Sequence, residues 1–105
     1  ISRRDFAISN ENDDYLGQVS LKNIDDDEGS AEISVVLKGG FHGKGIAAEA
    51  VTQLMRIGFY GLHLNVLYSY TKIENKKAVR LFENLGFEKK EAGEGSFLFV
   101  KVFNC

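Results

Sequence analysis

The chain has 105 residues with 44% hydrophobic and 27% charged side chains, which predicts a single globular domain spanning residues 1–105. It has no apolar run of about 20 residues and no apolar leader, which argues against a membrane span or a signal peptide. The net charge of −2 disfavours a nucleic-acid partner, and the single cysteine, Cys105, excludes an internal disulfide or a cysteine-based metal site. We therefore expect a cytoplasmic protein without a metal.

The first third of the chain predicts three strands joined by short turns. A brief apolar segment covers 5–9, apolar and polar residues alternate over 16–21, and β-branched residues dominate 31–37. Short turns between successive strands indicate an antiparallel meander. The acidic run 25–28 is interpreted as a solvated hairpin loop rather than a metal site, because no calcium-loop spacing follows it.

Helices and strands alternate in the remainder of the chain. Apolar residues at helical spacing predict helices over 46–60 and 76–85, and Asn75 is a suitable N-cap for the second. A strand over 65–71 lies between them, and strands over 87–91 and 97–103 follow. The order βββ-α-β-α-ββ predicts an α+β (mixed α/β) fold in two layers.

A glycine-rich turn over 38–45 connects the third strand to the first helix and holds four glycines in eight residues. The first turn of the helix has no Ser, Thr, Asp or Asn cap, so its amide N–H groups lack a side-chain partner. Glycines allow a ligand to approach the backbone, and Lys44 adds a positive charge. We interpret this turn as a phosphate-binding site, with a plain strand-to-helix turn as the alternative.

Two common phosphate-binding motifs fit this turn poorly. A P-loop requires Ser or Thr after Gly43-Lys44, where Gly45 stands. Gly43, Gly45 and Ala48 match the dinucleotide fingerprint G-x-G-x-x-[GA], but antiparallel strands precede them and no acid lies between Glu49 and Glu74.

Three segments together resemble the GNAT N-acetyltransferases. Segment 32–37 resembles the family's fourth strand, 41–50 its acetyl-CoA turn and third helix, and 75–87 its N-x-x-A…G-F segment. The similarity runs from about Arg3 to Phe103 and is greatest to the branch of ribosomal-protein and spermidine N-acetyltransferases. It implies a GNAT-like fold with a mostly antiparallel central sheet. It also implies that acetyl-CoA is the co-substrate and that the acceptor is a primary amine of a protein N-terminus, a polyamine or another small molecule.

The resemblance also implies where the site residues lie. Glu32 is the candidate base, and Phe82 occupies the position of the family's usual tyrosine acid. Tyr68 and Tyr70 share one strand face and are alternative proton donors. The residues expected to bind coenzyme A come from the fourth strand, the turn and the start of each helix: Val35, Val36, Leu37, Phe41, His42, Gly43, Lys44, Gly45, Ile46, Ala47, Asn75, Lys77 and Ala78.

Departures from the family pattern keep other functions open. Gly40 replaces the Gln or Arg of the turn, Phe82 lacks a hydroxyl, and the family's first strand and helices have no counterpart, which implies an N-terminally truncated form. The alternatives are a degenerate or truncated coenzyme A-binding module without catalysis and a small α+β interaction domain.

Apolar residues outside the predicted core stripes suggest self-association. Met55, Phe59 and Tyr60 lie off the main apolar line of the first helix, and 97–100 is continuously apolar, as in a strand covered on both faces. We expect a homodimer, with exchanged C-terminal strands as one arrangement.

Overall fold

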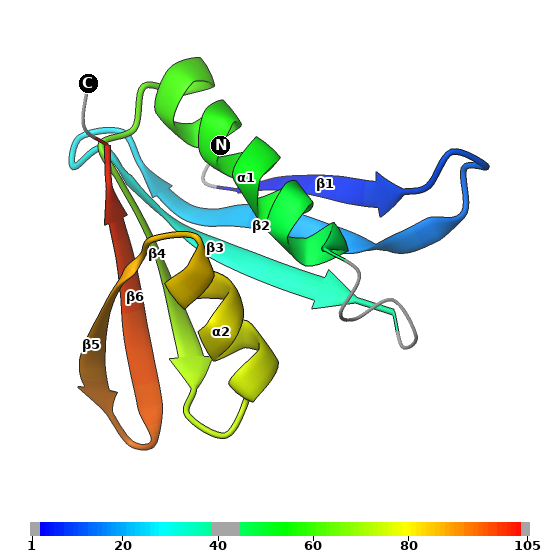
Figure 1. Cartoon of the computed structure of the whole chain (residues 1–105). Coiled ribbons are helices and arrows are strands. Elements are labelled where there is room, and N and C mark those ends of the chain that lie inside the picture. Colours follow the sequence, from blue (N-terminus) through cyan, green and yellow to red (C-terminus); the bar gives the residue numbers. More distant parts are fainter. Residues whose placement is uncertain (1–2, 39–44, 104–105) are drawn as a thin grey trace.

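A computed structural model describes residues 3–38 and 45–103, which form one sheet with two helices packed against it (Figure 1). The six strands lie in the order β1-β2-β3-β4-β6-β5. The expected order of elements and the mostly antiparallel sheet are confirmed, since β3 and β4 form the one parallel pair of the described sheet. The elements are β1 (Arg4–Ser9), β2 (Tyr15–Asp25), β3 (Ser30–Leu37), α1 (Ile46–Arg56), the π-helical turn η1 (Ile57–Gly61), β4 (Val66–Lys72), α2 (Lys76–Asn84), β5 (Glu88–Gly93) and β6 (Ser96–Val102).

Both helices cover the same face of the sheet (Figure 1). Every second residue of a strand points toward the helices, because successive side chains of a strand lie on opposite faces of the sheet. The buried core joins all the layers and consists of Val19, Leu21, Ala31, Ile33, Val51, Leu54, Phe59, Leu64, Leu67, Phe82, Phe87 and Phe99. Burying these side chains is the main favourable term in folding a chain of this size.

The helix expected over 46–60 changes geometry near its end. Regular α-helix stops at Arg56, and the Leu62 N–H donates to the Ile57 carbonyl at 2.8 Å, which is the wider spacing of a π turn. The turn buries Phe59 and leaves Tyr60 67% exposed. Of the three residues off the main apolar line, Phe59 thus joins the core, whereas Tyr60 is left in solvent.

The last strand, β6, is buried to different degrees along its length. Phe99 points toward α2 and is fully buried, stacked on Phe82 with ring centroids 5.5 Å apart. Val102 of the same strand is 52% exposed. Over 97–100, the segment on which the expectation of a strand covered on both faces rested, Phe99 is buried and the other three residues are partly buried.

The acidic turn between β2 and β3 is the expected hairpin loop. The Asp25 carboxylate accepts the N–H groups of Asp27 and Glu28, each at 3.0 Å, so the carboxylate organises its own turn. Within 3–38 and 45–103, no group of three or more potential metal ligands comes together. In the same ranges, neither helix has the length and apolar character needed to cross a membrane.

Candidate active site

The parallel strands β3 and β4 pair for only a short distance and then separate. Their register runs from Ser30 opposite Val66 to Glu32 opposite Tyr68. β3 continues to Leu37 and β4 to Lys72, without further pairing between them. Separated strands leave backbone N–H and C=O groups free for another hydrogen-bonding partner.

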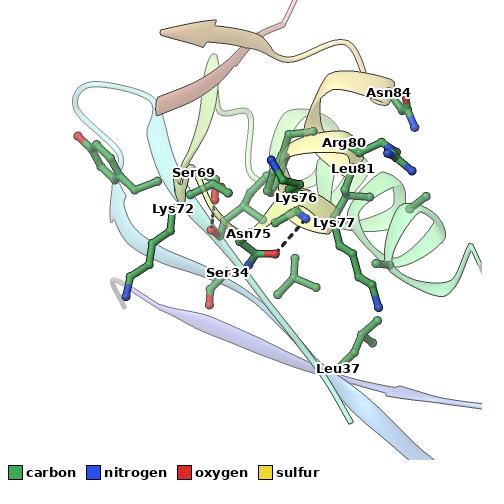
Figure 2. Close-up of a pocket in the computed structure, with 18 of the residues that line it drawn as sticks. Ser34, Leu37, Ser69, Lys72, Asn75, Lys76, Lys77, Arg80, Leu81 and Asn84 are labelled. Atoms are coloured by element: carbon green, nitrogen blue, oxygen red, sulfur yellow. Dashed lines mark hydrogen bonds between the residues drawn. The ribbon is translucent and has the colours of Figure 1, made fainter. Parts of the chain in front are cut away.

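A cavity of about 650 Å³ opens between the separated strands and α2 (Figure 2). Its walls include Ile33 and Leu37 of β3, Ser69 of β4 and Leu81 of α2. Extended backbone on one side and apolar side chains on the other suit a long flexible ligand with amide groups.

The start of α1 forms one end of this cavity. Gly45 precedes the helix in a left-handed conformation, with φ of 74°, and among the described residues no side chain caps the helix amides. A Cβ built on Gly45 meets nothing within 4 Å, so space for a ligand remains in front of the helix. Free amides at the positive end of a helix favour an anion there.

The start of α2 brings positive charge to the same cavity. The Asn75 side chain caps the helix by accepting the Ala78 N–H at 3.3 Å, as predicted. Among the described residues, the cavity is lined by five cations, Lys22, Lys72, Lys76, Lys77 and Arg80, against one acid, Glu32. This excess favours a polyanionic ligand.

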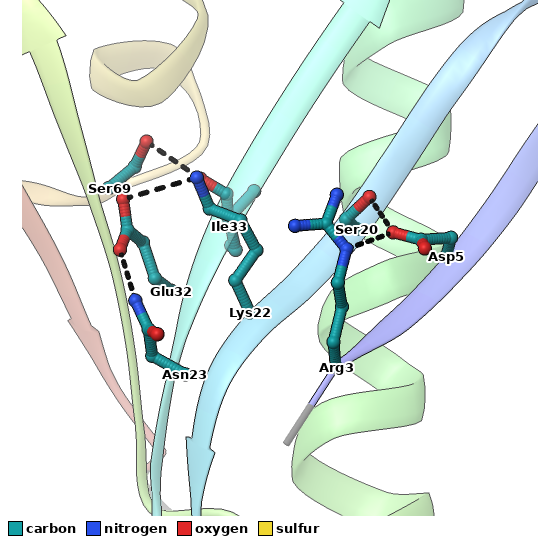
Figure 3. A network of polar contacts seen from close by, with 8 residues as sticks. All are labelled: Arg3, Asp5, Ser20, Lys22, Asn23, Glu32, Ile33 and Ser69. Atoms are coloured by element: carbon teal, nitrogen blue, oxygen red, sulfur yellow. Dashed lines mark hydrogen bonds and ion pairs between the residues drawn. The ribbon is translucent and has the colours of Figure 1, made fainter. Parts of the chain in front are cut away.

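Glu32 is the last residue of β3 that pairs with β4, and two side chains of β2 hold its carboxylate (Figure 3). One carboxylate oxygen accepts the Asn23 amide at 2.9 Å, and the other lies 3.8 Å from the Lys22 ammonium. A carboxylate has about four lone-pair positions, so these contacts orient the group and still leave acceptor capacity.

Two aromatic residues of β4 lie on the sheet face away from the helices. The Tyr68 and Tyr70 rings meet edge to face with centroids 6.0 Å apart, which confirms that they share a face. Burial, followed by the negative charge of Glu32, raises the pKa of the Tyr68 phenol above its usual value. Tyr68 therefore remains a protonated hydrogen-bond donor across the neutral range.

Phe82 of α2 lines the cavity and is 3% exposed. Its ring packs against Phe87 and Phe99, with centroids 5.1 and 5.5 Å away. The side chain is an anchor of the core that also forms part of the cavity wall. It presents a hydrocarbon surface and no acidic proton to the cavity.

Most of the described residues expected at the site line this one cavity. Those in its wall are Glu32, Val35, Leu37, Gly45, Ala47, Asn75, Lys77, Ala78 and Phe82. Val36 and Ile46 are not among the residues that line it. Phe41, His42, Gly43 and Lys44 lie outside the described residues.

Sequence reasoning missed two kinds of wall residue. Arg80 and Lys72 add charge, and Ser69 places a buried hydroxyl between the strands. The available signal was Ser69 and Thr71 at core-facing positions of a strand, where apolar residues usually stand.

The chain matches the family model described as "Acetyltransferase (GNAT) domain" over residues 2–88. It is 33% identical over 109 residues to the N-acetyltransferase p20 of Bacillus licheniformis, covering 98% of this chain and 61% of that protein. It is 30% identical over 86 residues to a spermidine N(1)-acetyltransferase of Vibrio cholerae, covering 82% of this chain and 50% of that protein.

A solved structure shows the same fold. A mutant of the spermidine N-acetyltransferase SpeG of Vibrio cholerae superposes with a TM-score of 0.88 at 25% identity, covering 96% of this chain and 64% of that one. The chain thus spans one half to about two thirds of the length of these relatives. The family match over most of the chain, together with the separated β3 and β4, shows that this protein belongs to the GNAT acetyltransferases.

Proposed function

We propose that the chain binds acetyl-CoA between β3 and β4 and transfers its acetyl group to a primary amine, such as a polyamine or a protein N-terminus. The observation that carries this proposal is the separation of the two strands beyond Glu32 and Tyr68. It leaves extended backbone along a cavity that can hold a narrow amide-containing arm. Membership of the GNAT family supports the same reaction class.

Acetyl-CoA fits the charge of this cavity. The molecule carries several phosphate charges, and Lys77, Arg80 and the uncapped start of α1 offer positive partners. The amide of Asn75 can donate to the arm while its oxygen remains in the helix cap. The turn residues 41–44, which lie outside the described residues, are assigned to the same phosphates through their backbone amides.

The proposed chemistry uses groups along β3. Backbone N–H groups of β3 that face the cavity polarise the thioester carbonyl, which becomes more negative as the amine adds. Glu32 takes a proton from the amine, directly or through water, with the lone pairs that Asn23 and Lys22 leave free. Holding the donor between two strands supplies the alignment that acetyl transfer needs.

One observation favours a second function. Phe82 contributes no hydroxyl, so a module that binds coenzyme A without catalysis is the alternative. Thiol release from acetyl-CoA, measured with spermidine and with a peptide bearing a free N-terminal amine, distinguishes the two. Release selects the enzyme, whereas calorimetric binding without release selects the module. A third result, with no thermal stabilisation by coenzyme A, selects an interaction domain, because a ligand at 100 times its Kd should add about 2.7 kcal/mol.

We also propose that the chain forms a homodimer through the end of α1 and η1. A hollow of about 320 Å³ there is lined by Met55, Tyr60 and Phe103 together with the cations Arg56 and Lys101. Tyr60 packs edge to face on Phe103 and remains largely exposed. The arrangement proposed is side by side through this surface, with exchanged C-terminal strands as the alternative.

A further inference from the structure

Ser69 bridges β3 and β4 just beyond the point where their pairing stops. Its hydroxyl donates a hydrogen bond to the Ile33 carbonyl at 3.1 Å, and the residue is 5% exposed (Figures 2 and 3). A buried carbonyl without a ladder partner needs another donor. The hydroxyl meets this need and lies in the wall of the cavity.

The bridge lies where the two strands begin to separate, and the start of α1 lies at the other end of the cavity. β3 covers about 13 Å from Ile33 to Leu37, at about 3.3 Å per residue. Gly45, before α1, lines the cavity as Leu37 does. This inference rests on the proposed function. If acetyl-CoA binds with its phosphates at the start of α1 and its arm along β3, its thioester lies near Ile33 and Ser69.

We propose that the Ser69 hydroxyl donates a hydrogen bond to the thioester sulfur as the carbon–sulfur bond breaks. The hydroxyl hydrogen rotates about its own bond, so it can turn from the Ile33 carbonyl toward the cavity. An amide N–H of the bound arm then takes its place at that carbonyl. Phe82, in the wall of the same cavity, has no hydroxyl for this task.

The proposed step conserves atoms and charge. The amine nitrogen forms a bond to the carbonyl carbon, and the electron pair of the carbon–sulfur bond goes to sulfur. Glu32 receives the proton that the amine loses. Ser69 keeps its own proton, because a hydrogen bond alone stabilises the negative sulfur, and the thiolate takes up a proton from water after release.

A binding measurement tests this contact without turnover. The thiol of bound coenzyme A is titrated by the ultraviolet absorbance of the thiolate, in the wild type and in Ser69→Ala. Loss of a donor to sulfur should raise the pKa of the bound thiol, so that the thiolate fraction at a fixed alkaline pH falls severalfold. An unchanged titration would overturn the proposed contact.

A kinetic test compares two variants at position 69 whose new side chains have nearly the same shape. Ser69→Thr retains a hydroxyl, and Ser69→Val replaces it with a methyl group, so the pair isolates the hydroxyl even where Ser69→Ala does not fold. We expect kcat to be about 10²-fold lower in the valine variant than in the threonine variant, with similar KM for acetyl-CoA. Equal kcat in the two variants would contradict the proposal and leave the proposed function standing.

A second substitution separates a chemical role from a structural one. Phe82→Tyr adds a hydroxyl in the wall of the same cavity, and it should accelerate Ser69→Val more than it accelerates the wild type. A merely structural Ser69 predicts equal factors in both backgrounds, which would overturn the inference. Thr52→Val is the matched control, because Thr52 also donates to a backbone carbonyl, that of Ala48 at 2.7 Å, and does not line the cavity.

Measurements on the wild type distinguish a failure of the proposed function from a failure of the proposed role of Ser69. Coenzyme A binding without thiol release from acetyl-CoA, with both amines, would overturn the enzymatic function and the role of Ser69 together. Thiol release by the wild type that is unaffected in Ser69→Val would overturn the role of Ser69 alone.

Discussion

Phe82 of α2 and Phe99 of β6 stack nearly parallel, with an interplanar angle of 25° and ring centroids 5.5 Å apart. The contact fixes α2 to the strand that lies next to β4 in the sheet. Because Phe82 also lines the cavity, the hydrophobic core holds one wall of the candidate site in place. Core packing and the geometry of the cleft are therefore coupled through Phe82.

Replacing Phe82 with leucine should lower the stability of the fold and leave the charge of the site unchanged. The substitution removes two aromatic contacts and part of a buried surface, so unfolding in urea should require about 1–3 kcal/mol less free energy. Tyr15→Leu, at an exposed aromatic position, is the control and should cost much less. Equal losses would show that Phe82 is not a main anchor of α2.

A negative charge at the start of α1 should weaken coenzyme A binding. Gly45→Asp places a carboxylate in open space in front of the helix amides, where phosphate is expected. Gly45→Asn has nearly the same shape and suffers the same backbone strain at positive φ, so it is the matched control. Calorimetry should show the aspartate variant binding at least about tenfold more weakly than the asparagine variant.

High salt should reduce this difference, because salt screens interactions between exposed charges. Identical affinities of the two variants at low salt would place the phosphates away from the start of α1. That result would remove the basis for assigning the glycine-rich turn to the ligand.

Two substitutions at Asn75 should separate its capping role from its ligand role. Asn75→Ala removes the acceptor for the Ala78 N–H and should reduce stability by about 1 kcal/mol. Asn75→Asp retains an acceptor, so stability should change little, while it loses the amide donor and adds a negative charge beside the cavity. Coenzyme A affinity should therefore fall in both variants, whereas thermal unfolding of the unliganded protein should shift only in the alanine variant.

Local patterns predicted much of this architecture because they act through neighbouring residues. Alternation over 16–21 defined part of β2, and Asn75 marked the start of α2 because a helix cap depends on contacts three residues away. The π turn at Ile57 was not predictable in this way, since its residues have the same apolar spacing as a regular helix. Burial of Phe59 depends on that local change of geometry.

Local sequence patterns predicted only part of the candidate site as well. The missing cap at α1 is a local property and was visible in the sequence. The bond from Ser69 to Ile33 joins residues 36 positions apart and exists because two strands separate in space. No pattern within either strand encodes that separation, so the hydroxyl in the cavity wall emerged only from the fold.

Disrupting the exposed end of η1 should convert the proposed dimer to a monomer. The hollow at the end of α1 and η1 is bordered by Tyr60, Phe103 and the cations Arg56 and Lys101. The acidic turn 25–28 lies at the same end of the molecule (Figure 1). Backbone hydrogen bonds connect the end of this turn to Phe103, since the Asn65 N–H donates to Gly29 and the Asn65 carbonyl accepts from Phe103. A two-fold axis through this end can therefore place the cations of one copy opposite the acids of the other.

Tyr60→Glu adds a charge at the centre of this surface and should shift the mass measured by light scattering from two chains to one. Glu49→Gln, at an exposed position in the first turn of α1, changes charge away from the surface and should leave the mass unchanged. Raising the salt concentration should also favour the monomer if opposite charges meet across the axis. A wild-type mass of one chain at every concentration, without aggregation, would show that Tyr60 is simply an exposed side chain and that the dimer proposal is wrong.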